Sequence, residues 1–178
     1  MKPITTLLLA ACVALASCAG PQVQDYAAER PLLDLRSYLD GPLLAHGVVT
    51  DRSGKVTRRF VVQLEGVWKG DVGTLTEDFR YSDGSTQQRV WHLTRSDGGR
   101  YEGRADDVVG VAVGQQAGNA FNWRYTLALP VDGRVWEVQF DDWMFLIDER
   151  TLLNRAAMSK FGVHVGDVTL SFTRLGAR

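Results

Sequence analysis

Short runs in which apolar and polar residues alternate fill most of this chain from about residue 43 onward. In the clearest run, every second position carries a large apolar side chain: Phe121, Trp123, Tyr125, Leu127 and Leu129. Successive side chains of an extended strand point to opposite sides, so these five residues share one face. The same two-residue period recurs in residues 60–64 and 168–172. It predicts β-strands with one buried face rather than helices.

Turn residues separate these runs at regular intervals. Asp-Gly pairs occur at Asp83-Gly84, Asp97-Gly98 and Asp132-Gly133, and an Asp-Gly pair between alternating segments is a strong hairpin signal. Two further turns are expected at residues 51–54 and 69–71. The resulting strands cover about residues 56–67, 73–81, 86–95, 100–104, 121–130 and 135–147, with others before and after them.

Serial hairpins of this kind predict an all-β domain. The favoured arrangement is an antiparallel up-and-down β-barrel of about 8–10 strands, lipocalin-like in layout, because closure leaves no exposed sheet edge. A two-sheet β-sandwich is the alternative. A short N-terminal helix is expected from Leu32 to Leu39, opened by Pro31 and ended by Gly41-Pro42, with Leu32, Leu35 and Leu39 on one face.

Gly110, Gly114 and Gly118 recur at every fourth position, as they would in a packing motif of membrane helices. Gln115-Gln116 interrupts this stretch, which is too short and too polar for that motif. Glycines among strands instead mark bends, bulges or close backbone approaches. We therefore expect irregular or tightly packed strand here, with a turn at Gly118-Asn119.

The first residues follow a different pattern. Lys2 precedes an apolar stretch at residues 5–15, which is too short to span a bilayer and is typical of a secretory signal peptide. It ends in Leu15-Ala16-Ser17-Cys18, which resembles the lipobox of bacterial lipoproteins. The resemblance implies cleavage before Cys18, followed by acylation of that cysteine. An ordinary secreted protein with an incidental Cys18 is the alternative.

The cysteine count favours lipidation. Of the two cysteines, Cys12 lies in the stretch that would be discarded, which leaves Cys18 alone and without a disulfide partner. The expected organisation is a signal peptide at residues 1–17, an acylated cysteine and flexible tether at 18–30, and a barrel domain at 31–178. Ala19 resembles the pattern of lipoproteins sorted to the outer membrane. The expected location is thus the bacterial envelope, facing the periplasm and held to the membrane through lipid on Cys18.

Charge and chemistry exclude several functions. Twenty basic and 21 acidic residues are interspersed, so no basic stripe predicts a nucleic-acid partner. The chain has no Gly-x-Ser-x-Gly elbow, and His46, His92 and His164 fall on separate predicted strands without local metal-site spacing. We predict no catalytic residue, metal or cofactor, although a haem site that uses one of these histidines stays open. The sequence leaves enzymatic activity undecided, and it says nothing of oligomeric state.

Two adjacent carboxylates interrupt an apolar strand at Phe140-Asp141-Asp142-Trp143-Met144-Phe145. Alternation places Asp141 and Asp142 on opposite faces, so one should point inward unless a bulge intervenes. A buried carboxylate needs a partner, and the following hairpin offers Asn154, Arg155 and Lys160. The group would be either a buried network that fixes register or the polar end of a ligand cavity. Glu77 and Arg80 present the same two alternatives.

Aromatic residues complete the candidate site. The five tryptophans serve either as core and rim packing or as the lining of a carrier cavity. The candidate ligand-binding residues are Asp141, Asp142, Asn154, Arg155, Lys160, Trp123, Tyr125 and Trp143.

Several segments together resemble an uncharacterised proteobacterial lipoprotein family catalogued as domain of unknown function 3833. The segments that carry the resemblance are 58–60, 75–84, 89–91, 118–120, 123–125, 140–144, 154–155 and 158–162. The resemblance spans the domain and implies no activity. The leading hypothesis is a membrane-tethered barrel that binds or carries an apolar small molecule such as a lipid or fatty acyl compound. A non-enzymatic envelope structural or assembly factor with a filled interior, and a lipid-modifying enzyme with a buried carboxylate, are the alternatives.

Overall fold

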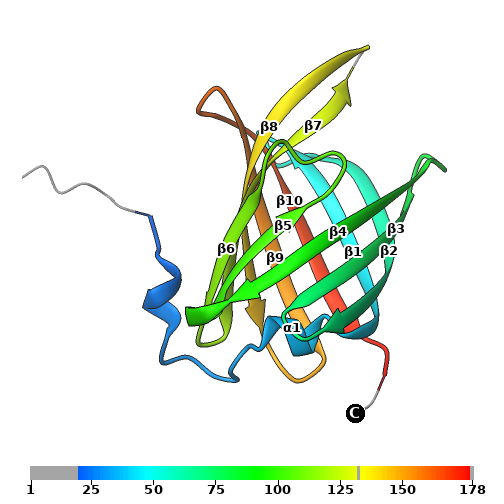
Figure 1. Cartoon of the computed structure of the whole chain (residues 1–178). Helices are drawn as coiled ribbons and strands as arrows, with labels where there is room; N and C mark the ends of the chain where they lie inside the picture. The colour runs from blue at the N-terminus through cyan, green and yellow to red at the C-terminus, as the bar shows by residue number, and fades with distance from the viewer. Residues whose placement is uncertain (1–19, 132, 177–178) are drawn as a thin grey trace, which may run out of the picture.

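A computed structural model of the chain describes residues 20–131 and 133–176. In this part of the chain, ten antiparallel strands follow one another around a closed barrel, and the last strand pairs with the first (Figure 1). The strands are β1 (Gly41–Asp51), β2 (Val56–Lys69), β3 (Val72–Tyr81), β4 (Thr86–Ser96), β5 (Arg100–Arg104), β6 (Ala112–Ala117), β7 (Ala120–Val131), β8 (Arg134–Leu146), β9 (Thr151–Lys160) and β10 (Val163–Arg174). The predicted up-and-down barrel is confirmed, and the sandwich alternative is wrong.

Local side-chain chemistry explains the tight turns at one end of the barrel. In the β1–β2 turn, one carboxylate oxygen of Asp51 accepts hydrogen bonds from the backbone N–H groups of Ser53 and Lys55. Asp83 plays the same part in the β3–β4 turn, where it accepts from the backbone N–H of Ser85. Gly54 and Gly84 follow with φ of +85°, a conformation that glycine adopts without steric cost.

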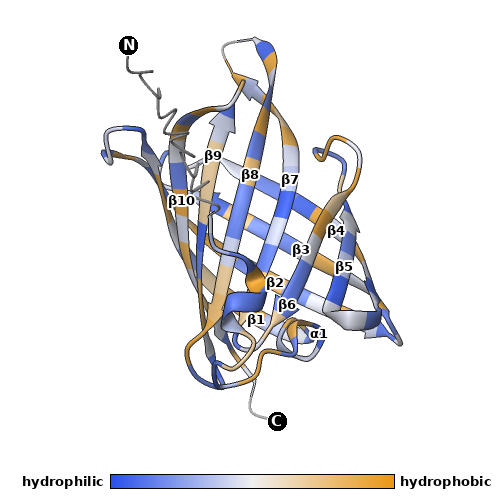
Figure 2. Ribbon diagram, turned by 90° about the vertical axis from the view of Figure 1, so that its left-hand side faces the viewer, coloured by the Kyte–Doolittle hydropathy of each residue, from blue (hydrophilic) through white to orange (hydrophobic). Residues whose placement is uncertain are grey.

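The two-residue period becomes the difference between the inside and the outside of the barrel. Along β2, the side chains of Phe60, Val62 and Leu64 are buried, while those of the residues between them are more exposed. Figure 2 shows the resulting bands of hydrophobic and hydrophilic residues along neighbouring strands. Pairing of β1 with β10, from Leu43 opposite Arg174 to Asp51 opposite Gly166, closes the ring.

The glycine-rich stretch forms strand rather than helix. Gly110 bends the chain with φ of +76° before β6, and Gly118 turns it with φ of +56° after β6. A Cβ atom on Gly114 would lie only 2.5 Å from the Trp123 ring and from the Asn122 carbonyl oxygen. The expected bends and close backbone approach are thus present.

The N-terminal helix is shorter than predicted. Helix α1 covers only Leu35–Tyr38, because the Asp34 side chain accepts a hydrogen bond from the backbone of Ser37 and so caps the helix start. Leu33, which precedes the helix, donates its N–H to the Gly118 carbonyl at 2.8 Å and is buried. Leu32 is 62% exposed, so the prediction that it shares the buried face with Leu35 and Leu39 is wrong.

Helix α1 lies across one end of the barrel (Figure 1). The Tyr38 hydroxyl donates to the carbonyl oxygen of Arg150 at 2.9 Å and also lies 3.2 Å from that of Phe172. The backbone N–H of Leu35 donates to the side-chain oxygen of Gln116. These hydrogen bonds join the helix to the ends of several strands, so that end of the barrel is covered.

Residues 20–30, expected to act as a tether, contact the outside of the barrel. The short 3₁₀ helix η1 (Val23–Tyr26) lies beside β6 and β7 (Figure 1). Val23 is buried, and the ring of Tyr26 packs against Trp143 and Phe145 of β8 at centroid distances of 5.7 and 5.1 Å. The signal peptide, the lipobox and Cys18 lie outside the described residues. Within the described ranges, no helix has the length and apolar character to cross a membrane.

Gly66 provides a test of how tightly α1 is seated. A Cβ atom at this position would lie 1.6 Å from the backbone carbonyl oxygen of Leu39. Gly66→Ala should therefore lower the free energy of unfolding by about 1–3 kcal/mol, the usual cost of overpacking. Chemical denaturation measures the change. Gly176→Ala is the control, since no atom lies within 4 Å of its built Cβ; equal stabilities for the two variants would contradict the tight seating of α1.

Candidate functional site

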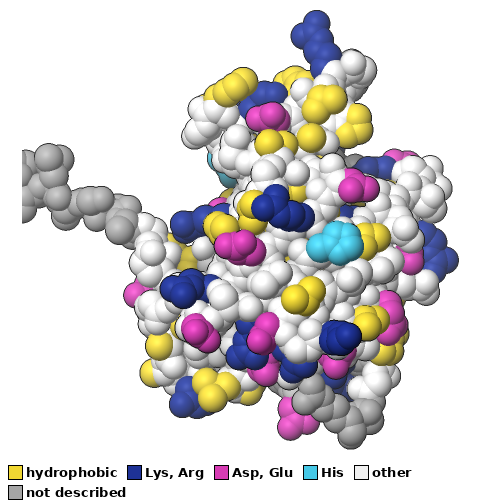
Figure 3. Space-filling model, in the orientation of Figure 1, with side chains coloured by type: hydrophobic (Ala, Val, Ile, Leu, Met, Phe, Trp, Pro, Cys, Tyr) yellow, Lys and Arg dark blue, Asp and Glu magenta, His cyan; other side chains and the backbone are white. Residues whose placement is uncertain are grey.

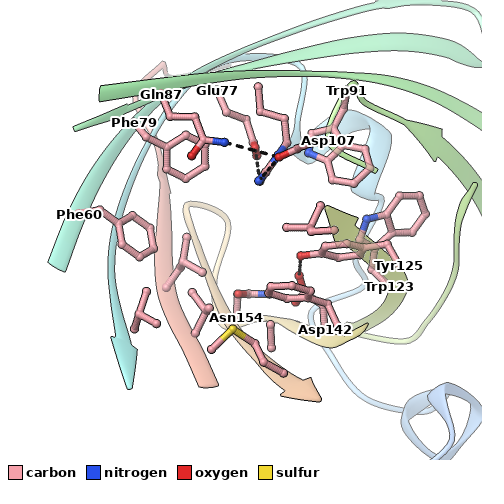
Figure 4. A pocket seen from close by; sticks show the side chains of 18 of the residues that line it. Phe60, Glu77, Phe79, Gln87, Trp91, Asp107, Trp123, Tyr125, Asp142 and Asn154 are labelled. Carbon is pink, nitrogen blue, oxygen red and sulfur yellow. Dashed lines mark hydrogen bonds and ion pairs between the residues drawn. The ribbon is translucent and has the colours of Figure 1, made fainter. Parts of the chain in front are cut away.

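The barrel encloses a cavity of about 530 Å³ (Figure 4). Its wall is mainly apolar and aromatic, and its largest side chains include Phe60, Phe79, Trp91, Trp123 and Phe140. Leu35 and Leu39 line it at the end covered by α1, while Arg58 and Val131 line it near the hairpin tips at the opposite end. The volume falls within the range of about 300–1,000 Å³ that is typical of small-molecule sites.

Aromatic contacts fix the shape of one side of this cavity. The Trp91 ring meets Trp123 and Tyr125 edge to face, at centroid distances of 5.7 and 5.5 Å. Tyr125 stacks on Phe140 at 5.0 Å. Such ring pairs add stability beyond the area they bury, and they hold the polar end of Tyr125 in a defined position.

One polar group in the cavity is an arginine held between two carboxylates. Arg89 on β4 donates to both carboxylate oxygens of Asp107, with its closest approach at 2.7 Å, and lies 3.5 Å from Glu77 on β3. Gln87 donates a further, longer hydrogen bond of 3.5 Å to Asp107. The loop between β5 and β6 supplies Asp107, and its backbone pairs with β7 through the Ala128 N–H. Arg89 is therefore neutralised by protein groups.

Burial dominates the electrostatics of this cluster. It raises the pKa of Glu77, and the attraction of Arg89 only partly offsets the rise. Burial alone would lower the pKa of Arg89, but hydrogen bonds to Asp107 and the charge of Glu77 hold the pKa above its ordinary value. Arg89 thus stays charged, with Asp107 as its closest partner and a second acid, Glu77, nearby.

A second polar group lies at the opposite wall and centres on Asp142. Asp142 on β8 is 6% exposed and accepts a hydrogen bond from the Asn154 side-chain amide on β9. The Tyr125 hydroxyl approaches its other oxygen at 3.4 Å. The Asn154 amide oxygen has no hydrogen-bond partner, although the residue is only 3% exposed and lines the cavity. Figure 4 shows these three side chains directed toward one another.

Asp142 has no cationic partner among the described residues. Burial raises the pKa of its carboxyl to about 7. The hydrogen bonds from Asn154 and Tyr125 oppose this rise, while the charges of Glu77 and Asp141 add to it. Burial and the same carboxylate hold the pKa of Tyr125 well above its ordinary value.

The structure divides the candidate residues into two groups. Trp123, Tyr125, Asp142 and Asn154 line the cavity. The other four do not line it. Asp141, Arg155 and Trp143 lie on the outside of the barrel, where they contact Arg124, Asp167 and Tyr26, and Lys160 at the end of β9 lies over the Trp136 ring. The expected inward cluster that includes Arg155 and Lys160 is therefore not formed: strand alternation turns Arg155 outward, and Lys160, at the end of β9, contacts Trp136 instead.

The Arg89 cluster was not predicted from the sequence, although one signal was present. Counting outward from the β3–β4 turn places Arg89 opposite Glu77 in the hairpin register. Arg80, which the sequence singled out together with Glu77, lies on the other face of β3. No local signal indicates Asp107, because a loop carries it to Arg89 from a different part of the chain.

The histidines do not converge. His46, His92 and His164 are exposed on β1, β4 and β10, and His164 contacts Asp167 at 3.0 Å. In the described part of the chain, no group of three or more His, Cys, Asp or Glu residues is arranged to hold a metal ion.

A closed ten-strand barrel with a short helix across one end and a largely apolar interior cavity defines a lipocalin-like protein. The chain also matches a family model described as "Protein of unknown function (DUF3833)" over residues 12–174, so it belongs to that family. The resemblance to domain of unknown function 3833 that was drawn from the sequence is thereby confirmed. No curated protein matches the chain.

Solved structures share the fold at low sequence identity. An S-type phycobiliprotein lyase, CPES, from Guillardia theta is similar with a TM-score of 0.61 and 7% identity, covering 89% of this chain and 100% of the lyase. A protein of unknown function from the DUF3598 family of Nostoc punctiforme PCC 73102 has a TM-score of 0.52 and 15% identity, covering 83% of this chain and 51% of that one. Identities this low relate the folds alone.

The raised pKa of Asp142 predicts how stability depends on pH. The folded state binds this proton more tightly than the unfolded chain, so the free energy of unfolding should fall as pH rises from about 4 to about 7. Asp142→Asn should remove this contribution, which makes the variant more stable than the native protein by a few kcal/mol at pH 8 but not at pH 4. Denaturation at both pH values measures the difference. Asp141→Asn, which alters the neighbouring outward carboxylate, should not produce it.

Proposed function

We propose that this protein is a membrane-anchored envelope lipoprotein whose barrel binds an apolar small molecule. The cavity of about 530 Å³ carries the proposal. A wall of aliphatic and aromatic residues with a few convergent polar groups is the usual composition of a ligand site. The shared fold of the phycobiliprotein lyase is compatible with ligand binding, and the nature of the ligand is argued from this chain alone.

The volume of the interior bears on the alternatives. A structural or assembly factor was expected to have a barrel filled by its own side chains, whereas this interior leaves a ligand-sized space. The lipid-modifying enzyme with a buried carboxylate would need Asp141 or Asp142 beside a cationic group such as Arg155. Here Asp141 and Arg155 lie outside with separate partners, and Asp142 lies inside, so no such pair forms.

Exposed apolar residues near the open end support an apolar ligand. Val131, Val135 and Trp136 are exposed around the β7–β8 turn, and Phe161 is 89% exposed in the β9–β10 turn. Figure 3 shows hydrophobic side chains gathered at the top of the molecule, over the β7–β8 hairpin, with lysine or arginine among them. Elsewhere on that face acidic and basic side chains are interspersed. An apolar surface beside the cavity opening favours exchange with a lipid phase or a carrier.

The membrane anchor is proposed from the sequence at Leu15-Ala16-Ser17-Cys18. More than one acyl chain on Cys18 would hold the protein durably, since a single chain gives only reversible binding. The outer membrane, with the barrel in the periplasm, is the location that Ala19 favours. Only residues 19–22 separate Cys18 from the segment 23–26, which contacts β6 and β7.

Filling part of the cavity should weaken ligand binding. Val168 on β10 lines the cavity, whereas its neighbour Thr169 is exposed on the outside. Val168→Trp should weaken binding of an uncharged apolar fluorophore such as Nile red by about tenfold or more, equivalent to about 1.4 kcal/mol. Thr169→Trp is the matched control and should bind as the native protein does. Equal binding by both variants, or failure of the native protein to bind the fluorophore or retain any co-purified apolar molecule, would overturn the binding proposal.

Replacement of one cysteine tests the anchor. Cys18→Ser should move the protein from the membrane fraction to the soluble fraction and abolish incorporation of labelled palmitate, because the thiol that receives the lipid is gone. Cys12→Ser, in the stretch expected to be removed, should change neither. Membrane retention of the Cys18→Ser protein would contradict lipidation at this residue.

A further inference from the structure

We propose that the cavity selects apolar molecules that carry a protonated amine, which Asp142 and Asn154 bind, and that it discriminates against fatty-acid carboxylates. This inference rests on the proposed ligand-binding function and specifies its ligand. It follows from the hydrogen-bonding capacity and charge of the cavity wall, taken group by group.

The cationic side chains of the wall, Arg89 and Arg58, already pair with acidic side chains, although the buried Nε of Arg58 has no hydrogen-bond partner. Arg89 is bound by Asp107 and lies near Glu77. Arg58, near the cavity opening, pairs with Asp83 at 2.8 Å and lies over the Tyr81 ring. A carboxylate ligand would have to compete with these acids for the two guanidinium groups, and it would enter a wall that already carries Glu77, Asp107 and Asp142. Like charges in a site of low dielectric are unfavourable.

Asp142 and Asn154, in contrast to the arginines, have hydrogen-bond acceptor sites without donors. An ionised carboxylate has about four lone-pair sites, and here the protein supplies donors only from Asn154 and Tyr125. The Asn154 amide oxygen adds an acceptor that has no partner and is buried. Asp142 and Asn154, on the adjacent strands β8 and β9, thus both line the cavity and both have acceptor capacity that the protein leaves unused.

A protonated amine meets both needs. It has up to three N–H donors, so it can donate to Asp142 and to the Asn154 oxygen at once, and its charge compensates the carboxylate. A buried charge without a partner is costly, and a ligand that provides the partner gains the difference. The aromatic rings of Tyr125 and Trp123 on the same side can accommodate the adjoining apolar part.

Protonation gives the site a pH dependence. Below about pH 7 the Asp142 carboxyl is protonated and neutral, and above it the charge that attracts an amine is present. The other titratable groups that face or adjoin Asp142 are Tyr125 on β7, Glu77 on β3, Arg89 on β4, Asp107 in the β5–β6 loop and the outward Asp141. Tyr125 remains neutral and Arg89 remains charged over this range, while Glu77 loses charge in the same direction as Asp142 when pH falls.

Displacement of Nile red from the full, lipid-depleted chain by decylamine, decanol and decanoate tests this assignment. At pH 8 decylamine should bind about tenfold or more tightly than decanoate, with decanol between them. Lowering the pH to 6 should weaken decylamine about tenfold, as the fraction of ionised Asp142 falls. These comparisons use the native chain and do not depend on the folding of any variant. The Val168→Trp protein measures non-specific partition.

Adjacent aspartates on opposite faces provide the matched variants. Asp142→Asn should weaken decylamine about tenfold while changing decanol by less than about twofold, and Asp141→Asn should leave both unchanged. The amine assignment would be overturned if decanoate bound as tightly as decylamine or more tightly. It would also be overturned if the two variants affected decylamine equally, either both weakening its binding or both leaving it unchanged. If Nile red binds but the three displacers have the same affinity, the amine assignment is wrong while the proposed binding function stands. If Nile red does not bind the native chain, the binding function fails.

Discussion

Pairing of β1 with β10 converts a series of hairpins into a closed barrel, and the rest of the structure depends on it. Closure leaves no free sheet edge and gives every strand one face toward an enclosed interior. Helix α1 covers one end of the barrel, where its backbone and side chains form hydrogen bonds with the ends of strands. With one end covered, the interior becomes a cavity with an opening at the hairpin tips.

The cavity combines an apolar wall with polar groups that the protein only partly satisfies. The Arg89 cluster is internally balanced, because each guanidinium contact goes to a carboxylate from another segment. The Asp142 group lacks such balance: its carboxyl has a raised pKa, and its amide neighbour has an unpartnered oxygen. Burying groups in this state costs folding free energy. A ligand that supplies the missing donors would recover part of that cost. The groups that lower the free energy of unfolding would therefore be the same groups that select the ligand.

The N-terminal segment connects the proposed anchor to the barrel more closely than a free tether would. Tyr26 packs on Trp143 and Phe145, and the Gly118 turn comes so near the Tyr26 carbonyl that a Cβ there would lie 1.7 Å from its oxygen. Trp143 therefore has a structural role on the outer wall, whereas Trp123 on the neighbouring strand lines the interior. Two tryptophans from similar alternating segments thus have different roles because they occupy opposite faces.

The sequence by itself determined the strands, their turns and the separation of Asp141 from Asp142. These features follow from a two-residue period and from Asp-Gly turn chemistry, both of which act between near neighbours in the chain. It also indicated the family through segments spread over the domain. The tertiary structure alone decided that the barrel leaves a cavity, that Asn154 rather than Arg155 or Lys160 reaches Asp142, and that Asp107 joins Arg89. The shortening of α1 belongs to this second group, because Leu33 bonds to the Gly118 turn in place of a helical turn. These outcomes depend on closure and on contacts between distant segments, which local periodicity does not encode.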